Sequence, residues 1–375
     1  MRGGLAALAA LAFAAAAFAP SVASAEPMDP AIERLVTDPG CHTETGAISQ
    51  DSITNSTACR ADHAAFKRAM SQWGWVVAPS AMHSARTTGF GGFNLALEMG
   101  IHDISEDKDY WKLGTQGPRD PSSEKASVRN PSPDGTLNTY SVKLRKGFGF
   151  GLEMTGQVGF IPQTSIMSGG ADVRMSLLEG FRTGVGGILP DFAVGGGVRT
   201  VTGTPQFQLT VAALDMQISK PLPIADSQVL TPWIGYQYVW IFGDSGLIDT
   251  TPATDPIGFC NYAGPNVPGN PDLGSPSKNP VDPSGNPTHI YDGQPVCRGG
   301  NPLDFNNNVV FDKARIKRQR MMFGLNYRYE MVSVGGQFIT DIVDPADAQS
   351  DDATKEALQG EDRQWSVIIE LGAIF

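Results

Sequence analysis

Ten segments of this chain alternate apolar side chains with small or polar ones, and this constrains the fold more than any other feature. Residues 148–160 show it best, because their even positions run from Phe148 to Phe160 and are apolar except for Gly156, while the odd ones are Gly, Glu, Thr or Gln. A period of two is typical of a β-strand, whose successive side chains point to opposite faces. The run is longer than the ~5–6 residues of a usual strand.

The same alternation recurs along the chain. The predicted strands are residues 93–101, 140–144, 148–160, 171–177, 192–198, 207–218, 230–242, 321–329, 332–338 and 365–375. In 207–218 the phase slips at Ala212–Ala213, where we expect a bulge. Ten is an even number of strands, which suits an antiparallel up-and-down barrel.

The connections between these strands are uneven in length. If the strands alternate in direction, the three longest connections, 104–137, 243–315 and 343–363, fall on one side, and the tight turns at 145–148 and 330–331 fall on the other. Transmembrane barrels have long outward loops and short periplasmic turns. We therefore predict an all-β fold, a transmembrane antiparallel up-and-down β-barrel of about ten strands over residues 91–375.

Composition excludes several other classes. No apolar stretch after the N-terminus reaches the ~20 residues of a spanning helix. A pI near 4.9 and the absence of a large basic cluster argue against nucleic-acid binding. A soluble β-sandwich remains the alternative fold.

The first 25 residues have the features of an export signal. Met1-Arg2 is positive, the stretch from Leu5 to Phe18 is apolar, and Ala23-Ser24-Ala25 fits a cleavage site. We predict that residues 1–25 are removed. Export would place the four cysteines in an oxidising compartment, and their spacing favours the pairs Cys41–Cys59 and Cys260–Cys297, one of three pairings.

The last strand, Gln364 to Phe375, resembles the C-terminal insertion signal of bacterial outer-membrane β-barrels. Phe375, Leu371, Ile369 and Val367 match its alternating pattern, while Ala373 departs from it because that position is usually larger. The resemblance implies the outer membrane as the location. It also implies the insertion machinery, the lipid bilayer and lipopolysaccharide as partners. It names no solute.

Aromatic side chains at the strand ends are expected to form girdles at the two membrane interfaces. Ten residues separate Trp365 from Phe375, which is ~25 Å of height at a tilt of ~40°. The residues predicted to face lipid are Phe148, Phe150, Phe160, Trp240, Trp365 and Phe375.

If apolar side chains face lipid, the other face lines a charged lumen. Four acids and five bases fall there: Glu98, Lys143, Arg145, Glu153, Asp172, Arg174, Arg199, Arg328 and Glu370. Buried charges need partners. A cross-barrel network of salt bridges and a lining for solute passage are both open interpretations.

Residues 26–90 are predicted to form a partly helical N-terminal segment. Phe66, Met70, Trp73 and Val77 lie on one face of a helix that Pro79 ends. This helix either packs on the periplasmic mouth of the barrel or enters the lumen as a plug. The second arrangement is similar to the N-terminal hatch of FadL-type fatty-acid transporters, although those barrels have more strands.

Catalytic and metal chemistry has little support in the sequence. His102-Asp103, followed by Glu106, Asp107 and Asp109, is the best catalytic candidate, and some outer-membrane barrels are hydrolases with His and acidic residues at the rim. An acidic, solvated loop is the simpler interpretation, so we predict no catalytic residue.

The 243–315 loop carries eight aspartates that suit Ca²⁺: Asp244, Asp249, Asp255, Asp272, Asp282, Asp292, Asp304 and Asp312. Their spacing matches no calcium motif, so no cofactor is expected and Ca²⁺ is kept as the one candidate ion. The sequence thus predicts an outer-membrane barrel with a structural role or a narrow pore for small solutes. The alternatives are a surface-loop binding protein and a rim hydrolase.

Overall fold

The computed structural model describes residues 26–37, 60–80, 83–118, 129–179, 189–225, 227–250, 258–262, 295–299 and 308–375. Its helical elements are η1 (Ile32–Arg34), α3 (His63–Val77), α4 (Asp109–Leu113), η3 (Gly149–Gly151) and α5 (Asp352–Ala357). None of these helices is long and apolar enough to cross a membrane.

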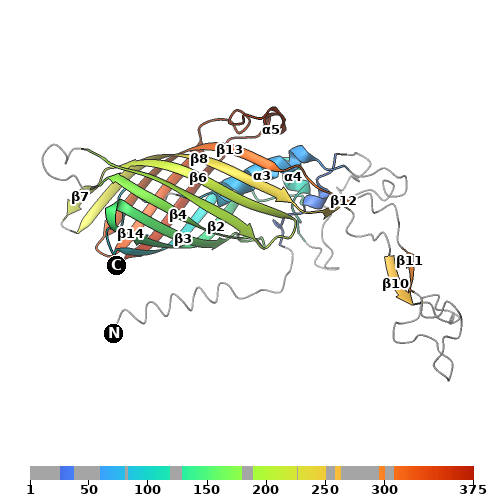
Figure 1. The fold of residues 1–375 in the computed structure, drawn as a ribbon, viewed down its shortest axis with the longest axis horizontal. Helices are drawn as coiled ribbons and strands as arrows, with labels where there is room; N and C mark the ends of the chain where they lie inside the picture. The colour runs from blue at the N-terminus through green and yellow to red at the C-terminus, as the bar shows by residue number, and fades with distance from the viewer. Residues whose placement is uncertain are drawn as a thin grey trace, which may run out of the picture.

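Ten antiparallel strands close into a barrel (Figure 1). They are β1 (Phe93–Asp103), β2 (Thr136–Gly147), β3 (Leu152–Phe160), β4 (Met167–Leu178), β5 (Asp191–Thr202), β6 (Phe207–Ser219), β8 (Gln228–Ser245), β13 (Ala314–Tyr329), β14 (Val332–Asp341) and β15 (Trp365–Ile374). Each pairs with its sequence neighbours in the barrel, and β15 closes the ring on β1. The predicted fold class and strand number are confirmed.

Five short strands lie outside the ring. They are β7 (Leu222–Ala225), β9 (Ile248–Asp249), β10 (Gly258–Tyr262), β11 (Pro295–Gly299) and β12 (Asn308–Val309). β7 extends the sheet by pairing with the start of β8, while β9–β12 and β10–β11 form two small antiparallel pairs within the predicted 243–315 loop.

The barrel has two unlike ends. We call one the turn end, because β2–β3, β6–β8 and β13–β14 are joined there by short connections and β15 finishes there. The opposite one is the loop end, where the long connections carry α4 and β12, at the right of the barrel in Figure 1, and α5, which lies above the barrel there. This division agrees with the loop asymmetry expected from the sequence.

Two strands near the loop end are longer than predicted. β13 begins at Ala314 rather than at residue 321, and β8 continues to Ser245. The outward positions Arg315, Lys317 and Gln319 are polar, so this stretch lacks the apolar face by which the other strands are recognised. Arg315 instead forms an exposed ion pair with Asp244 on β8.

The strand predicted at 148–160 is shorter than expected. β3 begins at Leu152, and residues 148–151 form a turn in which Phe150 and Gly151 have φ of 61° and 71°. Phe150 is 99% exposed at the turn end, so it is a turn residue and the prediction that placed it on the strand was wrong. Phe148 also precedes the strand. Gly149 and Gly151 alternate with Phe148 and Phe150, so the sequence pattern has a period of two although these residues form a turn.

No bulge interrupts β6, contrary to the expectation at Ala212–Ala213. Its register with both neighbours is continuous, and Phe207, Leu209, Val211 and Ala213 all face inward. The pattern slips because the inward face is apolar near the loop end and polar near the turn end. The apolar helix that occupies the loop-end half of the lumen explains this change of polarity.

Candidate functional site: the occupied lumen

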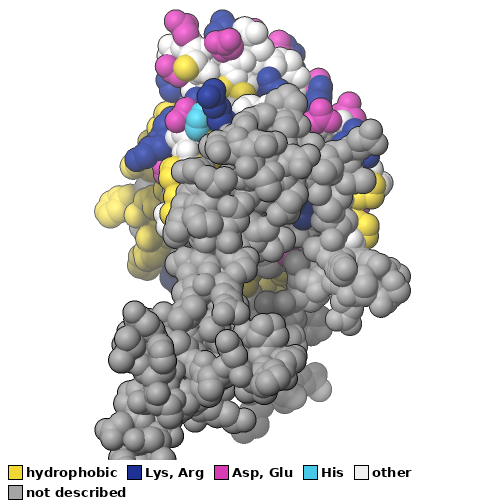
Figure 2. Space-filling view, turned by 90° about the vertical axis from the view of Figure 1, so that its right-hand side faces the viewer, with side chains coloured by type: hydrophobic (Ala, Val, Ile, Leu, Met, Phe, Trp, Pro, Cys, Tyr) yellow, Lys and Arg dark blue, Asp and Glu magenta, His cyan; other side chains and the backbone are white. Residues whose placement is uncertain are grey.

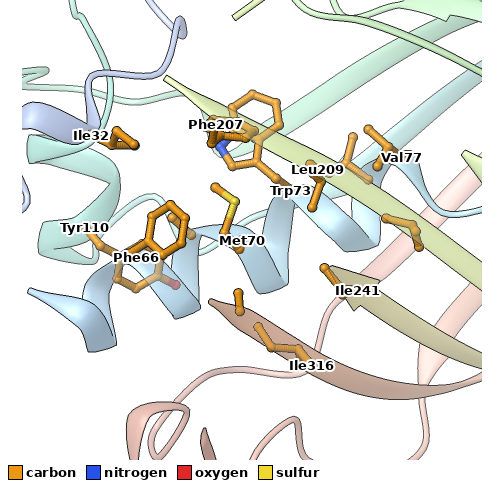
Figure 3. Packing of buried hydrophobic residues seen from close by; sticks show 14 of the residues in the cluster. Ile32, Phe66, Met70, Trp73, Val77, Tyr110, Phe207, Leu209, Ile241 and Ile316 are labelled. Carbon is orange, nitrogen blue, oxygen red and sulfur yellow. The ribbon is translucent and has the colours of Figure 1, made fainter. Parts of the chain in front are cut away.

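Helix α3 lies inside the loop-end half of the barrel. Asp62 caps its first turn by accepting a hydrogen bond from the amide of Ala65 (2.8 Å). The predicted helical face, Phe66, Met70, Trp73 and Val77, is at most 5% exposed and packs with inward residues of several strands, including Leu209, Ile241 and Ile316 (Figure 3). The structure thus places this helix in the lumen and not on the periplasmic mouth.

Two features let α3 fit so closely. Gly74 faces β8, and a Cβ added there would stand 2.5 Å from Ile241 Cγ2, so only glycine permits this approach. At the loop end the Phe66 ring stacks on Phe311, with centroids 4.8 Å apart. The apolar inner face of β6 therefore matches an apolar helix rather than water.

Arg320 holds the C-terminal end of the helix. Its guanidinium donates to the carbonyl oxygens of Trp75 (3.3 Å) and Pro79 (2.8 Å) and to the side chain of Gln237. A cation at this position satisfies carbonyls that the helix leaves free and complements its dipole.

Arg318 holds the middle of the same helix. It forms a fully buried ion pair with Asp341 of β14 and donates to Ser71 Oγ (2.7 Å). The Trp75 ring lies 5.0 Å from the Cζ atom of Arg318 and 4.9 Å from that of Arg320, so it contacts both cations.

Sequence reasoning missed both arginines because it began this strand at residue 321. Their alternation with the outward cations Arg315 and Lys317 resembled a solvated basic stretch. Reading the period of two further toward the N-terminus would have placed them on the inner face.

The chain continues along the lumen after α3. Ser80 donates to Glu98 (2.9 Å) and accepts from Lys143 (2.8 Å), and Arg174 donates to His83 Nε2 (2.8 Å). The amide of Ala85 then donates to Ser219 Oγ near the turn end (3.1 Å). Residues 63–80 and 83–85 thus occupy the lumen from the loop end toward the turn end.

Eight of the nine predicted lumen charges lie inside the barrel. Lys143 pairs with Glu98 and contacts Glu370 (3.8 Å), and Arg145 pairs with Glu370 (2.8 Å). The remaining contacts join Arg199 to Asp172 and Arg174 to Asp215 (3.2 Å), while Glu153 accepts a hydrogen bond from the amide of Thr88 (2.9 Å). Each predicted inner charge of these pairs has a counter-charge or a hydrogen-bond partner.

Arg328 is the exception to this network. It is exposed beside the β13–β14 turn, and its Nε donates to the carbonyl oxygen of Glu330 (3.0 Å). Its sequence phase is inward, but it lies at the strand end, where an inward side chain already meets solvent. Conversely, Asp215 and His83 belong to the network and were not predicted, because Asp215 follows the phase slip and His83 lies outside any strand.

Little free volume remains between these groups. The cavity lined by Ser80, His83, Lys143, Arg174 and Asp215, among others, has a volume of about 20 Å³. This is room for one or two water molecules. At this place in the lumen the described side chains therefore leave little free volume.

His102 is not at the rim. It is buried inside the barrel, with Nδ1 2.9 Å from Ser366 Oγ and Nε2 3.0 Å from Thr139 Oγ1, and Trp75 Nε1 also donates to Ser366 (2.8 Å). Glu106, Asp107 and Asp109 are exposed on the loop beyond β1. The predicted His–acid cluster is thus not assembled, and this His–Ser pair is enclosed by α3.

The metal and disulfide predictions fall mostly outside the described residues. Asp255, Asp272, Asp282, Asp292, Asp304, Cys41 and Cys59 lie there, as does the predicted signal at 1–25. Among the residues that are described, no three His, Cys, Asp or Glu side chains group as for a metal. Cys260 and Cys297 stand opposite each other in the β10–β11 register. Their disulfide stays a prediction.

A buried polar cluster ties the plug to the loops above it. The Gln72 side chain accepts from the Ser105 amide (3.0 Å) and Trp111 Nε1 (2.6 Å), and its amide nitrogen donates to Glu361. Tyr110 also donates to the Glu361 carboxylate (2.9 Å). The β1–β2 loop and the β14–β15 loop thus both bind the side chain of Gln72 on α3.

This cluster predicts a pH effect at the loop end. Burial raises the pKa of Glu361 above its ordinary value of 4.5, although hydrogen bonds from Gln72 and Tyr110 oppose the shift. A raised carboxyl pKa gives a stabilisation that is complete below 4.5 and is lost as the pH rises through the folded pKa. Hydrogen exchange over 104–113, corrected for intrinsic rates, should be slower at pH 4.5 than at pH 8. The Glu361→Gln variant should show no such difference, and an equal difference in both proteins would contradict the assignment.

The outer surface of the barrel is apolar. Outward apolar side chains encircle it, among them Leu97, Met99, Val158, Met175, Val198, Leu214, Met216, Phe323, Leu325, Ile369 and Leu371. Of the predicted girdle residues, Phe160, Trp240 and Trp365 lie toward the loop end, while Phe148, Phe150 and Phe375 lie at the turn end. Seen from the loop end, charged side chains gather at the top of the molecule and hydrophobic ones show at its flanks (Figure 2).

A closed ring leaves no unpaired strand edge, and its apolar band suits hydrocarbon. The architecture is that of a bacterial outer-membrane β-barrel. An even strand number and long loops at one end complete it.

Comparison with known proteins finds likeness in structure only. No protein-family model and no curated protein matches the chain. It resembles Ail, the attachment invasion locus protein of Yersinia pestis, with 8% identity, a TM-score of 0.23, and coverage of 76% of this chain and 99% of that one. Omp33 of Acinetobacter baumannii has 8% identity, a TM-score of 0.23 and coverage of 76% and 97%. OprG of Pseudomonas aeruginosa has 9% identity, a TM-score of 0.23 and coverage of 78% and 99%.

Proposed function

We propose that this barrel resides in the outer membrane with its loop end outward. In the resting state residues 60–80 and 83–88 close it, and it passes small solutes only when these residues are displaced. The observation that carries the proposal is the match between α3 and the inner wall. Apolar wall residues meet the apolar helix face, and charged ones meet Ser80 and His83.

The charged lining supports a hydrated path once the segment moves. Removing it would uncover Lys143, Arg174, Arg318 and Arg320, each now in contact with a residue between 71 and 83. An empty lumen of this kind would fill with water, because unpaired buried charges are costly. The lining would hold acids and bases together and so would favour small polar solutes over apolar ones.

Planar-bilayer recordings test this proposal. The full-length protein should show no conductance steps, and a variant lacking residues 26–90 should show stable ones. Heat-dependent gel mobility must first show that both barrels are folded. If the truncated barrel is folded and still silent, the pore role is wrong and a structural role remains.

The proposed partners follow from the two ends of the barrel. The Phe375 side chain is 65% exposed, so it adds little to packing and is free to serve the insertion machinery as a signal. Lipopolysaccharide would surround the loop-end half, where Arg315 and Lys317 face outward next to Trp240. The hydrolase alternative gains no support from His102, which lies behind the plug.

A further inference from the structure

The chain begins its described path at the loop end. The amides of Met28, Ala31 and Ile32 donate to Gln163 O (3.1 Å), Gly114 O (2.9 Å) and Gln206 Oε1 (2.8 Å). These acceptors belong to the β3–β4, β1–β2 and β5–β6 connections, all at the loop end. Residues 27–36 are therefore bonded to three separate loops.

This docking is not a loose surface contact. Met28, Ala31, Ile32 and Leu35 are each at most 1% exposed. The Asp29 carboxylate accepts from Ser165 Oγ (2.8 Å) and from the Ser165 amide (2.5 Å). The segment is an integral part of the loop-end cap.

The first barrel strand nevertheless starts at the opposite end. After α3, the contacts of Ser80, His83 and Ala85 descend the lumen, and the amide of Gly91 then donates to Gly147 O at the turn end (3.3 Å). β1 rises from there. Ten strands keep the start of β1 and the end of β15 at one end, as the bond from the Phe93 amide to Phe375 O shows. The segment inside the lumen adds an eleventh membrane crossing to those of the ten strands.

We infer that residues 26–37 lie on the outer side of the membrane and are joined to the barrel by a polypeptide that crosses through the lumen. Together with α4 and the β3–β4 and β5–β6 loops they form the surface presented there. A tag joined to residues 26–37 would therefore be displayed outside the cell. The inference rests on the proposed orientation of the barrel.

Epitope insertions at three exposed sites test this topology in intact bacteria. One tag stands between Glu26 and Pro27, one between Glu106 and Asp107 at the loop end, and one between Glu330 and Met331 at the turn end. Antibody binding is compared before and after permeabilisation. We expect the first two tags to be detected on intact cells and the third only after permeabilisation.

The other outcomes separate the two claims. If the 106/107 tag is detected on intact cells but the 26/27 tag only after permeabilisation, the inference is overturned and the orientation stands. If only the 330/331 tag is exposed on intact cells, the orientation fails and the inference with it. Should a tag prevent folding, labelling of single cysteines with an impermeant maleimide gives the same decision. The variants are Glu26→Cys, Asp107→Cys and Glu330→Cys, each in a chain whose four cysteines are changed to serine.

Discussion

The Gly74→Leu variant should convert the silent barrel into a conducting one. Any side chain at this position meets the buried Ile241 at less than 3 Å, and Ile241 is held in β8 between two paired strands. The wall is hydrogen-bonded on both sides, while α3 is held mainly by side chains, so the helix must move. Overpacking of this kind costs about 1–3 kcal/mol. Conductance steps in planar bilayers measure the result.

Gly156→Leu is the matched control. Gly156 lies on β3 at an outward position with nothing within 4 Å of an added Cβ, so the new side chain points into lipid. This variant should stay as silent as the unchanged protein. If Gly74→Leu gives a heat-shifted, folded barrel that is equally silent, then α3 is not what closes the lumen.

Replacing Arg318 with alanine should destabilise the protein far more than the loss of an exposed charge. Its partner Asp341 is fully buried and would lose its ion pair, keeping a hydrogen bond from the Gln364 amide (3.0 Å) and the more distant charge of Arg320. Removing one member of a buried pair costs about 3–5 kcal/mol, because the other charge remains without its counter-charge. Urea unfolding in lipid vesicles, followed by tryptophan emission, gives this difference.

Arg315→Ala on the same strand is the control for this loss. Its pair with Asp244 is exposed, at 43% and 39% of the two side chains, so its removal should cost about 0–1 kcal/mol. The double variant Arg318→Ala with Asp341→Ala should recover part of the loss. Equal destabilisation by Arg318→Ala and Arg315→Ala would show that the buried pair does not hold the wall and helix together.

The wall of the barrel could be predicted from the sequence because a strand has a fixed period of two. Wherever one face meets lipid, the alternation of Leu97, Met99 and Ile101 with Glu98 and Gly100 fixes both strand and face. The same signal fails above the apolar band. There Arg315 and Arg318 look alike in sequence, although one is in water and the other is fully buried.

The occupant of the lumen was harder to predict than its wall. The helical face from Phe66 to Val77 was visible, but its location depends on what it meets, and that partner is the apolar inner half of β6. The slip at Ala212–Ala213 was the available clue, since an inward apolar stretch in a charged lumen requires an apolar occupant. Contacts such as His83 with Arg174, 91 residues apart, carry no local pattern at all.

Quenching of tryptophan by brominated lipid tests most directly whether the apolar face meets hydrocarbon. Trp240 and Trp365 point outward, while Trp73, Trp75, Trp111 and Trp233 are buried within the barrel or under its loops. In vesicles of brominated lipid the unchanged protein should lose much of its outward tryptophan emission. The Trp240→Phe, Trp365→Phe double variant should be almost insensitive to the bromine. Quenching of the double variant as strong as that of the unchanged protein would mean that the inner tryptophans face lipid, and would contradict the fold's assignment to a membrane.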